Sequence, residues 1–137
     1  MTGSRRRLDK GDYQLLADFR YILRQFLSFS EEAAGGAGLA PQQHQALLAI
    51  KGAGGKMSIG DLAQKLLVRP HSAVGLVDRL VEAKLLQRDY DPKDRRRVLL
   101  TLTPNAERVL KLLTVAHRDE LNRVAPVLKS LLSELEQ

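Results

Sequence analysis

The chain has 137 residues, no cysteine, and 22 Lys and Arg against 16 Asp and Glu, a formal net charge of +6. Its length suits one domain, and the lack of cysteine excludes disulfides, thiol redox chemistry and Cys-ligated zinc. No apolar run is long enough to span a membrane, and the basic start lacks an adjacent signal-type apolar core. We therefore expect a cytoplasmic protein, and the positive charge makes an anionic partner plausible.

The N-terminal part predicts one long helix after a polar start. Residues 1–11 are polar and basic, with three consecutive arginines, and are expected to be disordered. From Asp12 to about Glu32, apolar residues recur at spacings of three and four, which predicts a helix. All three Phe and two of the three Tyr lie there, so its wide apolar face should meet both its own domain and another chain. A fully buried core helix is the alternative.

A Gly- and Ala-rich run, residues 33–38, is expected to end this helix. Pro41 then stands where a helix tolerates proline, in the first turn, and residues 42–51 predict the second helix. A glycine-rich turn, residues 52–56, separates the second helix from the third.

Two short helices separated by a tight turn come next. Ser58, followed three residues later by Asp61, resembles a capping box and predicts a helix over 59–66. Pro70 can occupy the first turn of another helix that runs to about Lys84. The inward stripe of that helix is predicted to consist of Ala73, Leu76, Val77 and Leu80.

A β-hairpin is predicted after these helices. Residues 85–90 and 97–103 have β-like patterns, and the turn-forming residues 91–94 lie between them. Thr103 before Pro104 predicts the start of a long helix, which Pro126 should break or kink. A final amphipathic helix then carries an apolar stripe that needs a partner surface, formed by Val127, Leu128, Leu131, Leu132 and Leu135.

The order helix, tight turn, helix, hairpin predicts a mainly α fold with a small β-hairpin wing, a winged helix-turn-helix. In such folds the second helix enters the major groove of DNA and the hairpin lies beside it. The wing is strongly basic, which suits phosphates or a minor groove, although a solvated charged loop is the alternative. Its cations are Arg88, Lys93, Arg95, Arg96 and Arg97.

One acidic residue stands among these cations. Because a carboxylate near DNA repels phosphate, Asp94 is predicted to hold an arginine in a fixed pose, and Arg96 is our candidate. Arg95 and Arg97 alternate with Arg96 and should reach phosphates or solvent.

The helix that begins at Pro70 should present a polar face to DNA. Near its start, His71 and Ser72 could contact base edges or phosphate, while Gly75 would allow close approach. Val74 could touch a thymine methyl. Arg79 could reach a phosphate or pair with Asp78 or Glu82. The candidate DNA contacts from this helix and its start are Arg69, His71, Ser72, Val74, Gly75 and Arg79.

Several motifs together resemble the MarR family: the run Asp61-Leu62-Ala63-Gln64-Lys65-Leu66, then Leu76-Val77-Asp78-Arg79-Leu80, Leu85-Leu86, Asp91-Pro92-Lys93-Asp94-Arg95-Arg96 and Leu102-Thr103-Pro104. The resemblance covers the chain from about Asp12 onward. It implies a homodimer on a pseudo-palindromic operator, with dimerisation helices in 12–38 and 104–137 around a winged helix-turn-helix in 39–103. It also implies that Asp94 orients Arg96 toward the minor groove.

The chain departs from that family at two positions. Lys84 stands where the family often has Gly, and Gly75 where it often has Arg, so an operator sequence cannot be transferred. Family members commonly bind small aromatic effectors, and such a site could involve Tyr13, Tyr21, Phe26 and His44. Ordinary packing is the alternative role of these side chains.

These observations predict a sequence-specific DNA-binding transcriptional regulator, a repressor released by a small-molecule effector. The alternatives are a winged-helix dimer that acts on another protein and a low-specificity architectural DNA-binding protein. We expect no enzyme, cofactor or metal, because the three histidines fall in no catalytic context and have no ligand-like spacing. A zinc sensor, known among relatives, is the alternative on this point.

Overall fold

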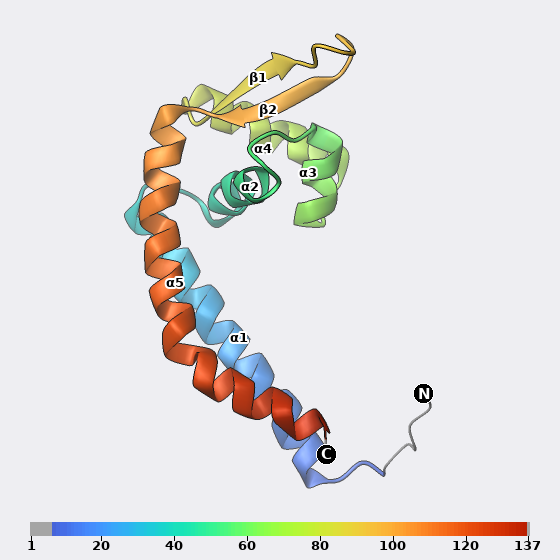
Figure 1. Ribbon diagram of the computed structural model, residues 1–137, viewed down its shortest axis with the longest axis vertical. Coiled ribbons are helices and arrows are strands. Elements are labelled where there is room, and N and C mark those ends of the chain that lie inside the picture. Colours follow the sequence, from blue (N-terminus) through green and yellow to red (C-terminus); the bar gives the residue numbers. More distant parts are fainter. Residues whose placement is uncertain (1–6, 137) are drawn as a thin grey trace. The chain divides into compact units, whose positions relative to one another are not determined.

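The computed structural model describes residues 7–136 and is mostly helical with one antiparallel hairpin (Figure 1). This is the fold class that the sequence predicts. The elements are α1 (Lys10–Gly36), α2 (Pro41–Gly52), α3 (Ile59–Leu66), α4 (Pro70–Glu82), β1 (Leu86–Tyr90), β2 (Val98–Leu102) and α5 (Pro104–Ser133), followed by a 3-10 turn, Glu134–Glu136.

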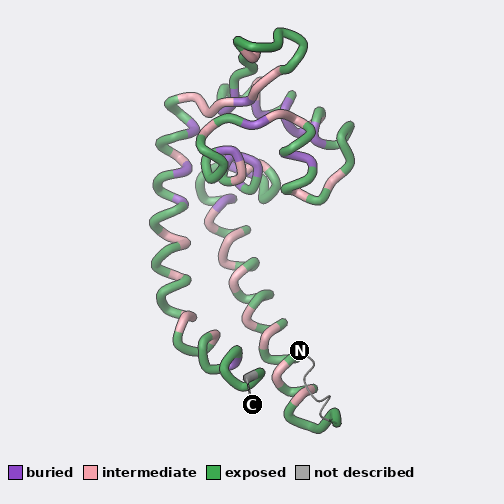
Figure 2. The backbone as a smooth tube through the Cα atoms, turned by 45° about the vertical axis from the view of Figure 1, so that its right-hand side comes forward, coloured by how far each residue is buried: buried purple, intermediate pink, exposed green. Residues whose placement is uncertain are grey.

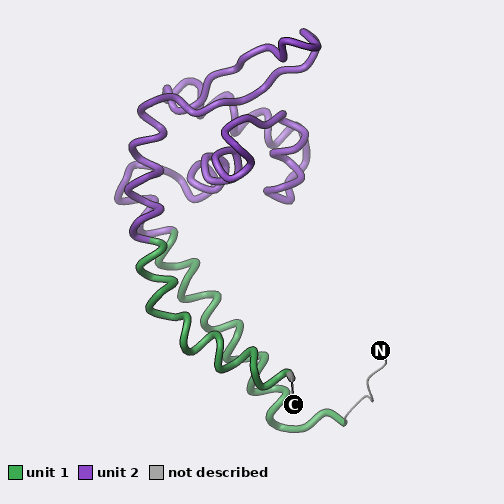
Figure 3. The backbone as a smooth tube through the Cα atoms, in the orientation of Figure 1, with its two compact units in different colours: residues 1–30, 117–137 green, residues 31–116 purple. Residues whose placement is uncertain are grey.

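The described chain forms two compact units (Figure 3). Residues 31–116 make up the first, which we call the winged-helix unit. The segments before Glu31 and after Ala116 make up the second, the two-helix unit, from most of α1 and the second half of α5.

The core of the chain lies in the winged-helix unit, where most of the buried stretches occur (Figure 2). Its largest fully buried side chains come from α2, α3, α4 and β2, so one apolar cluster joins the helices to the hairpin. They are Leu47, Ile50, Leu62, Val77, Leu80 and Leu100. Truncating such a leucine to alanine typically costs about 2–5 kcal/mol of stability.

Hydroxyl side chains cap two helices at the positions that the sequence predicts. The Ser58 Oγ accepts a hydrogen bond from the Asp61 N–H at 3.1 Å and starts α3. The Thr103 Oγ1 accepts from the Ala106 N–H at 3.2 Å and also donates to the Lys84 carbonyl at 2.7 Å. Thr103 therefore caps α5 and fixes the turn after α4 with one side chain.

Two non-glycine residues have left-handed backbone conformations, and each follows a helix of the helix-turn-helix. Leu67 ends α3 with φ 57°, and the N–H of the next residue, Val68, donates to the Ala63 carbonyl at 3.0 Å. Lys84 follows α4 with φ 61°. This geometry explains why glycine suits the position of Lys84, since a side chain there is strained.

The hairpin has a defined register and an anchor in the core. Arg88 pairs with Leu100 and Tyr90 with Val98 across the two strands. Leu100 is fully buried and also exchanges backbone hydrogen bonds with Met57, at 2.7 and 3.2 Å. The base of the wing is therefore fixed to the chain segment that leads into α3.

The two-helix unit is held by a few contacts. His117 on α5 hydrogen-bonds the Ser30 hydroxyl of α1 at 2.8 Å and meets the edges of Phe26 and Phe29. Leu131 is the only buried residue of the two-helix unit among the residues that the structure describes. On α5, the hydrogen bond from Arg123 lowers the pKa of the Glu120 carboxyl. Many large apolar side chains are exposed on this unit: Leu8, Tyr13, Leu16, Tyr21, Leu23, Leu27, Leu121, Val127, Leu132 and Leu135.

The start of α1 differs from the prediction, whereas its end lies inside the predicted run, 33–38. The helix begins at Lys10, because Asp9 and Asp12 exchange backbone-to-carboxylate hydrogen bonds of 2.9 and 3.1 Å that form a cap. The disorder predicted for residues 1–11 is thus wrong for 10 and 11, while residues 1–6 lie outside the described chain. The helix also continues to Gly36, because Ala34 is fully buried in the core and packing outweighs the low helix propensity of glycine.

The predicted separate C-terminal helix is wrong, because α5 runs without interruption through Pro126 to Ser133. The proline removes one backbone hydrogen bond. Ala125 and Leu128 near it are good helix formers, and Leu131 is buried little more than one turn later, so the helix persists. Within residues 7–136, no helix is both long and apolar enough to cross a membrane.

Candidate nucleic-acid interface

The predicted inward stripe of α4 is confirmed, and it leaves a polar face outward. Ala73, Leu76, Val77 and Leu80 are each at most 3% exposed. The opposite face carries residues that the sequence proposes as DNA contacts. Of these, His71, Ser72, Val74 and Arg79 are exposed and Gly75 is half-buried.

The start of α4 has no side-chain cap. Arg69 occupies the N-cap position in an extended conformation, and Pro70 is the first helical residue. The positive end of the helix dipole therefore lies beside the exposed Arg69, His71 and Ser72. This arrangement suits an anion such as a phosphate.

Gly75 interrupts the side chains on the exposed face of α4. A Cβ at this position would lie 3.7 Å from the Arg79 Nη1, an ordinary contact, so the fold does not require glycine. Glycine inside a helix costs about 0.5–1 kcal/mol relative to alanine. Its benefit is the close approach that a bare backbone allows to a molecule outside the chain.

The tip of the wing is organised by two aspartates. Asp91 accepts from the Lys93 N–H at 2.9 Å, and its own N–H donates to the Arg97 carbonyl at 2.9 Å. The Asp94 Oδ1 accepts from the backbone N–H of Arg96 at 3.0 Å and from its Nε at 3.3 Å. The predicted contact between Asp94 and Arg96 is therefore present, and the Arg96 side chain remains 93% exposed.

Two of the five wing cations contact carboxylates of the helix-turn-helix, which sequence reasoning missed. Arg88 forms an ion pair with Asp78 of α4. The Arg97 Nη2 lies 3.9 Å from the Asp61 Oδ2, at the start of α3. The suggested pairing of Arg79 with Asp78 is wrong, because Asp78 pairs with Arg88. The sequence signal was the β-strand alternation, which places Arg88 on the same face as the buried Leu86.

The other cations of this surface are directed outward. Lys93, Arg95, Arg69 and Arg79 are exposed, and none forms an ion pair with a carboxylate within residues 7–136. The α4 face and the wing tip thus present several uncompensated positive charges.

Tyr90 is a further surface residue that sequence reasoning did not select. It is 71% exposed at the end of β1. Together with Asp91, Pro92 and Arg95 it lines a shallow hollow at the base of the tip. An exposed aromatic ring between cations can pack on a sugar or a base.

The four candidate effector residues belong to different units. Tyr13 and Tyr21 are exposed on α1, and Phe26 packs against His117. At the rise of an α-helix, Tyr13 and Phe26 are roughly 20 Å apart along the helix axis. His44 is 3% exposed in the core of the winged-helix unit. A role for these residues in effector binding stays a prediction.

The segment that carries this surface matches known sequences. Residues 37–97 match the sequence model of the MarR family. The chain is 36% identical over 97 residues to YcgE of Bacillus subtilis, described as an uncharacterized HTH-type transcriptional regulator, with 71% of this chain and 60% of YcgE covered. It is 29% identical over 93 residues to the transcriptional repressor MdtR of the same organism, covering 68% and 57%. The chain thus spans about 60% of the length of these relatives.

Solved structures agree on the fold. A MarR family protein from Bacillus stearothermophilus superposes with a TM-score of 0.80 at 22% identity, covering 96% of this chain and 97% of that one. A MarR mutant from E. coli, solved in complex with operator DNA, has a TM-score of 0.67 at 19% identity, covering 93% and 99%. Residues 37–97 thus match the MarR family in sequence, and nearly the whole length of the chain matches a MarR family protein in fold.

Proposed function

We propose that the protein is a DNA-binding transcriptional regulator that recognises a specific operator. The observation that carries the proposal is the Asp94–Arg96 contact at the wing tip, beside a helix-turn-helix with an outward-facing polar face on α4. The contact pairs the guanidinium with a carboxylate and still leaves the Arg96 side chain 93% exposed. The related MarR structure with operator DNA supports the same use of this fold.

In this proposal α4 enters the major groove and the wing follows the phosphates to the adjacent minor groove. His71, Ser72 and Val74 are the residues of α4 placed to reach base edges. Arg69, Lys93 and Arg95 contact phosphates, and Arg96 enters the minor groove. The phosphate contacts give salt-dependent affinity, whereas the base contacts and the shape of the minor groove give specificity.

The regulator is proposed to act as a homodimer through its two-helix unit. Apart from Asp12, the residues lining a groove of about 430 Å³ between the start of α1 and the end of α5 are all apolar. Exposed leucines and tyrosines continue along both helices. A contiguous apolar surface of this kind is typical of a protein interface. Two copies would present two winged-helix units to a pseudo-palindromic operator.

The proposal includes repression, release by a small aromatic effector and action in the cytoplasm, where operator DNA is found. The relative MdtR, named as a repressor, supports the first. The effector rests on the family resemblance alone. Screening aromatic acids and phenols for loss of DNA binding tests the proposed release by an effector. A variant that still dimerises but binds no DNA is the control for aggregation.

Selection of bound duplexes from a randomised library tests the proposed function. We expect repeated rounds at physiological salt to recover a motif with two related half-sites one helical turn apart. Recovery of DNA without a shared motif would support the architectural alternative. Failure to retain any duplex would favour the alternative in which the winged helix acts on another protein.

A further inference from the structure

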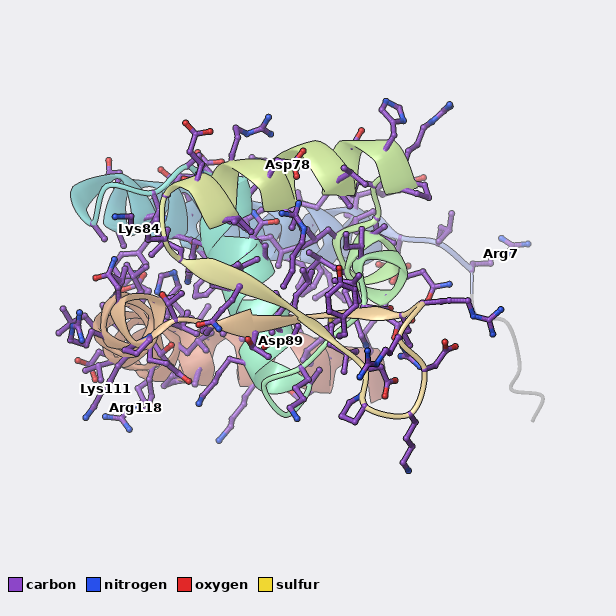
Figure 4. The ribbon with its side chains drawn as sticks, turned by 90° about the horizontal axis from the view of Figure 1, so that it is seen from above. Arg7, Asp78, Lys84, Asp89, Lys111 and Arg118 are labelled. Atoms are coloured by element: carbon purple, nitrogen blue, oxygen red, sulfur yellow. The ribbon has the colours of Figure 1, made fainter. Side chains whose placement is uncertain are left out.

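Asp78 and Arg88 link α4 to β1 on the candidate DNA-binding surface. Figure 4 shows Asp78 on α4. The Arg88 Nη2 donates a hydrogen bond to the Asp78 Oδ1. The side chains are 60% exposed for Asp78 and 38% exposed for Arg88, so the pair lies at the surface of the winged-helix unit and outside its core.

Local geometry directs both side chains toward each other. In β1, Leu86 is buried and Arg88 comes two residues later on the same face of the strand. The residue between Arg88 and Tyr90, Asp89, faces the other way and accepts a hydrogen bond from the Thr101 hydroxyl at 2.9 Å. On α4, Asp78 lies one turn after the exposed Val74. Arg88 therefore reaches across to the exposed face of α4.

The charge of Asp78 has two opposite effects on DNA binding. By Coulomb repulsion, a carboxylate on this face weakens binding to phosphate. By pairing with Arg88, the same carboxylate restrains the strand that leads into the wing tip. Half-exposed ion pairs add little to overall stability. We therefore expect Asp78 to affect DNA binding through the position of the wing and to add little to the overall stability.

We propose that Asp78 is a positioning residue, which holds Arg88 against α4 and thereby fixes the wing for DNA binding. This inference rests on the proposed function. It reassigns Arg88, which the sequence analysis counted among the cations facing phosphates or a minor groove, to a role within the protein. Among the wing cations, Lys93, Arg95 and Arg96 remain those that reach the DNA in this proposal.

The direction in which one substitution changes the affinity for DNA separates a positioning role from charge repulsion alone. Asp78→Asn removes a negative charge near the DNA, so repulsion alone predicts tighter binding. Positioning predicts binding weaker by up to about fivefold, the range for a half-exposed pair. Arg88→Gln should weaken binding to a similar extent, and the double variant should be no weaker than either single variant.

The dependence of affinity on salt adds a second criterion. Because Arg88 contacts Asp78 and no phosphate in this proposal, Arg88→Gln should leave the salt slope unchanged. Arg95→Gln, a matched loss of one wing cation, should lower the slope by about 1. Arg88→Lys, which retains the charge, should restore most of the lost affinity. Glu82→Gln, a matched loss of a carboxylate from the same helix, should not weaken binding.

Hydrogen exchange of the free protein tests the restraint without DNA. The amides of 87–90 and 98–101 should exchange faster in Asp78→Asn and Arg88→Gln than in the wild type and in Glu82→Gln. Faster exchange in a protein that binds no DNA would mean that the proposed function fails and the restraint stands. Unchanged exchange, tighter binding by Asp78→Asn, or a lower salt slope for Arg88→Gln would overturn the positioning role.

Discussion

At the scale of single residues, the wing tip places a carboxylate beside the arginine that we propose enters the minor groove. Asp94 accepts two hydrogen bonds from Arg96, one from its backbone and one from its side chain. The backbone bond fixes the turn and the side-chain bond restricts the guanidinium. Ordering this arginine before binding lowers the entropy lost when it enters a groove.

Arg96→Ala should weaken binding to the operator by about 1–3 kcal/mol and leave the dimer intact, because it removes a specific arginine contact. Fluorescence anisotropy with the operator and a scrambled duplex measures the effect. The control is Arg95→Ala, which should weaken binding to both duplexes alike. Wild-type affinity in Arg96→Ala would refute the minor-groove role.

Leu67 is a residue whose substitution should stabilise the protein. It is 91% exposed and has φ 57°, a conformation that favours glycine. Leu67→Gly should raise the free energy of unfolding by roughly 0.5–1 kcal/mol, measured by urea denaturation.

The control for Leu67→Gly is the reverse change at another left-handed position. Gly54 has φ 98°, and nothing lies within 4 Å of where its Cβ would stand, so Gly54→Ala adds backbone strain without a clash. That variant should be destabilised. A loss of stability in Leu67→Gly would show that the leucine side chain makes a contact that outweighs its strain.

Residue-level contacts were predictable where they are local in sequence. The Ser58 cap and the Asp94–Arg96 contact span three and two residues, so spacing and chemistry were sufficient. The Asp78–Arg88 pair joins two different elements. Its prediction requires knowing which face of β1 packs on α4, and this depends on the tertiary structure.

At the scale of whole elements, the prediction succeeded where the end signals are local. The bounds of α3 match the sequence prediction because Ser58 starts it and the turn at Leu67 ends it. The end of α1 at Gly36 lies inside the Gly- and Ala-rich run that the sequence predicts as its end. The continuity of α5 was missed, because the local signal of Pro126 is outweighed by packing of the nearby Leu131.

The ends of α1 and α5 provide a test of dimerisation. Leu132 and Leu135 are exposed in the chain by itself, so changing both to Asn should cost the monomer little. In a dimer that buries these leucines, each substitution should weaken the free energy of association by on the order of 1 kcal/mol or more per copy. Sedimentation velocity over a range of concentrations should therefore show dissociation at a concentration higher by tenfold or more.

The matched control is Leu48→Asn, which changes an exposed leucine on α2 of the winged-helix unit. It should dissociate like the wild type. An unchanged dimer in the Leu132 and Leu135 double variant would mean that the end of α5 is not at the interface.

At the scale of the whole molecule, the two units differ in how they are stabilised. The winged-helix unit has a contiguous apolar core, whereas Leu131 is the one buried residue of the two-helix unit in the described chain. The sequence predicted a wide apolar face on α1 and an apolar stripe at the C-terminal end that needs a partner surface. What covers them could not be derived from one chain.

The fold and family were predictable because the motifs of the helix-turn-helix and wing lie within one continuous segment, 37–97, that also matches the family model. The operator sequence was not predictable, because Gly75 and Lys84 depart from the residues common in the family. The shape of a groove contact at Gly75 depends on the DNA as much as on the protein.

The most direct test of the central claim is the affinity of the wild-type protein for the selected operator and for a scrambled duplex, each at two salt concentrations. Specific regulation predicts a preference for the operator of about 10³-fold or more at physiological salt, with both affinities falling as salt rises. Equal affinity for the two duplexes, with a steep salt dependence, would contradict operator recognition.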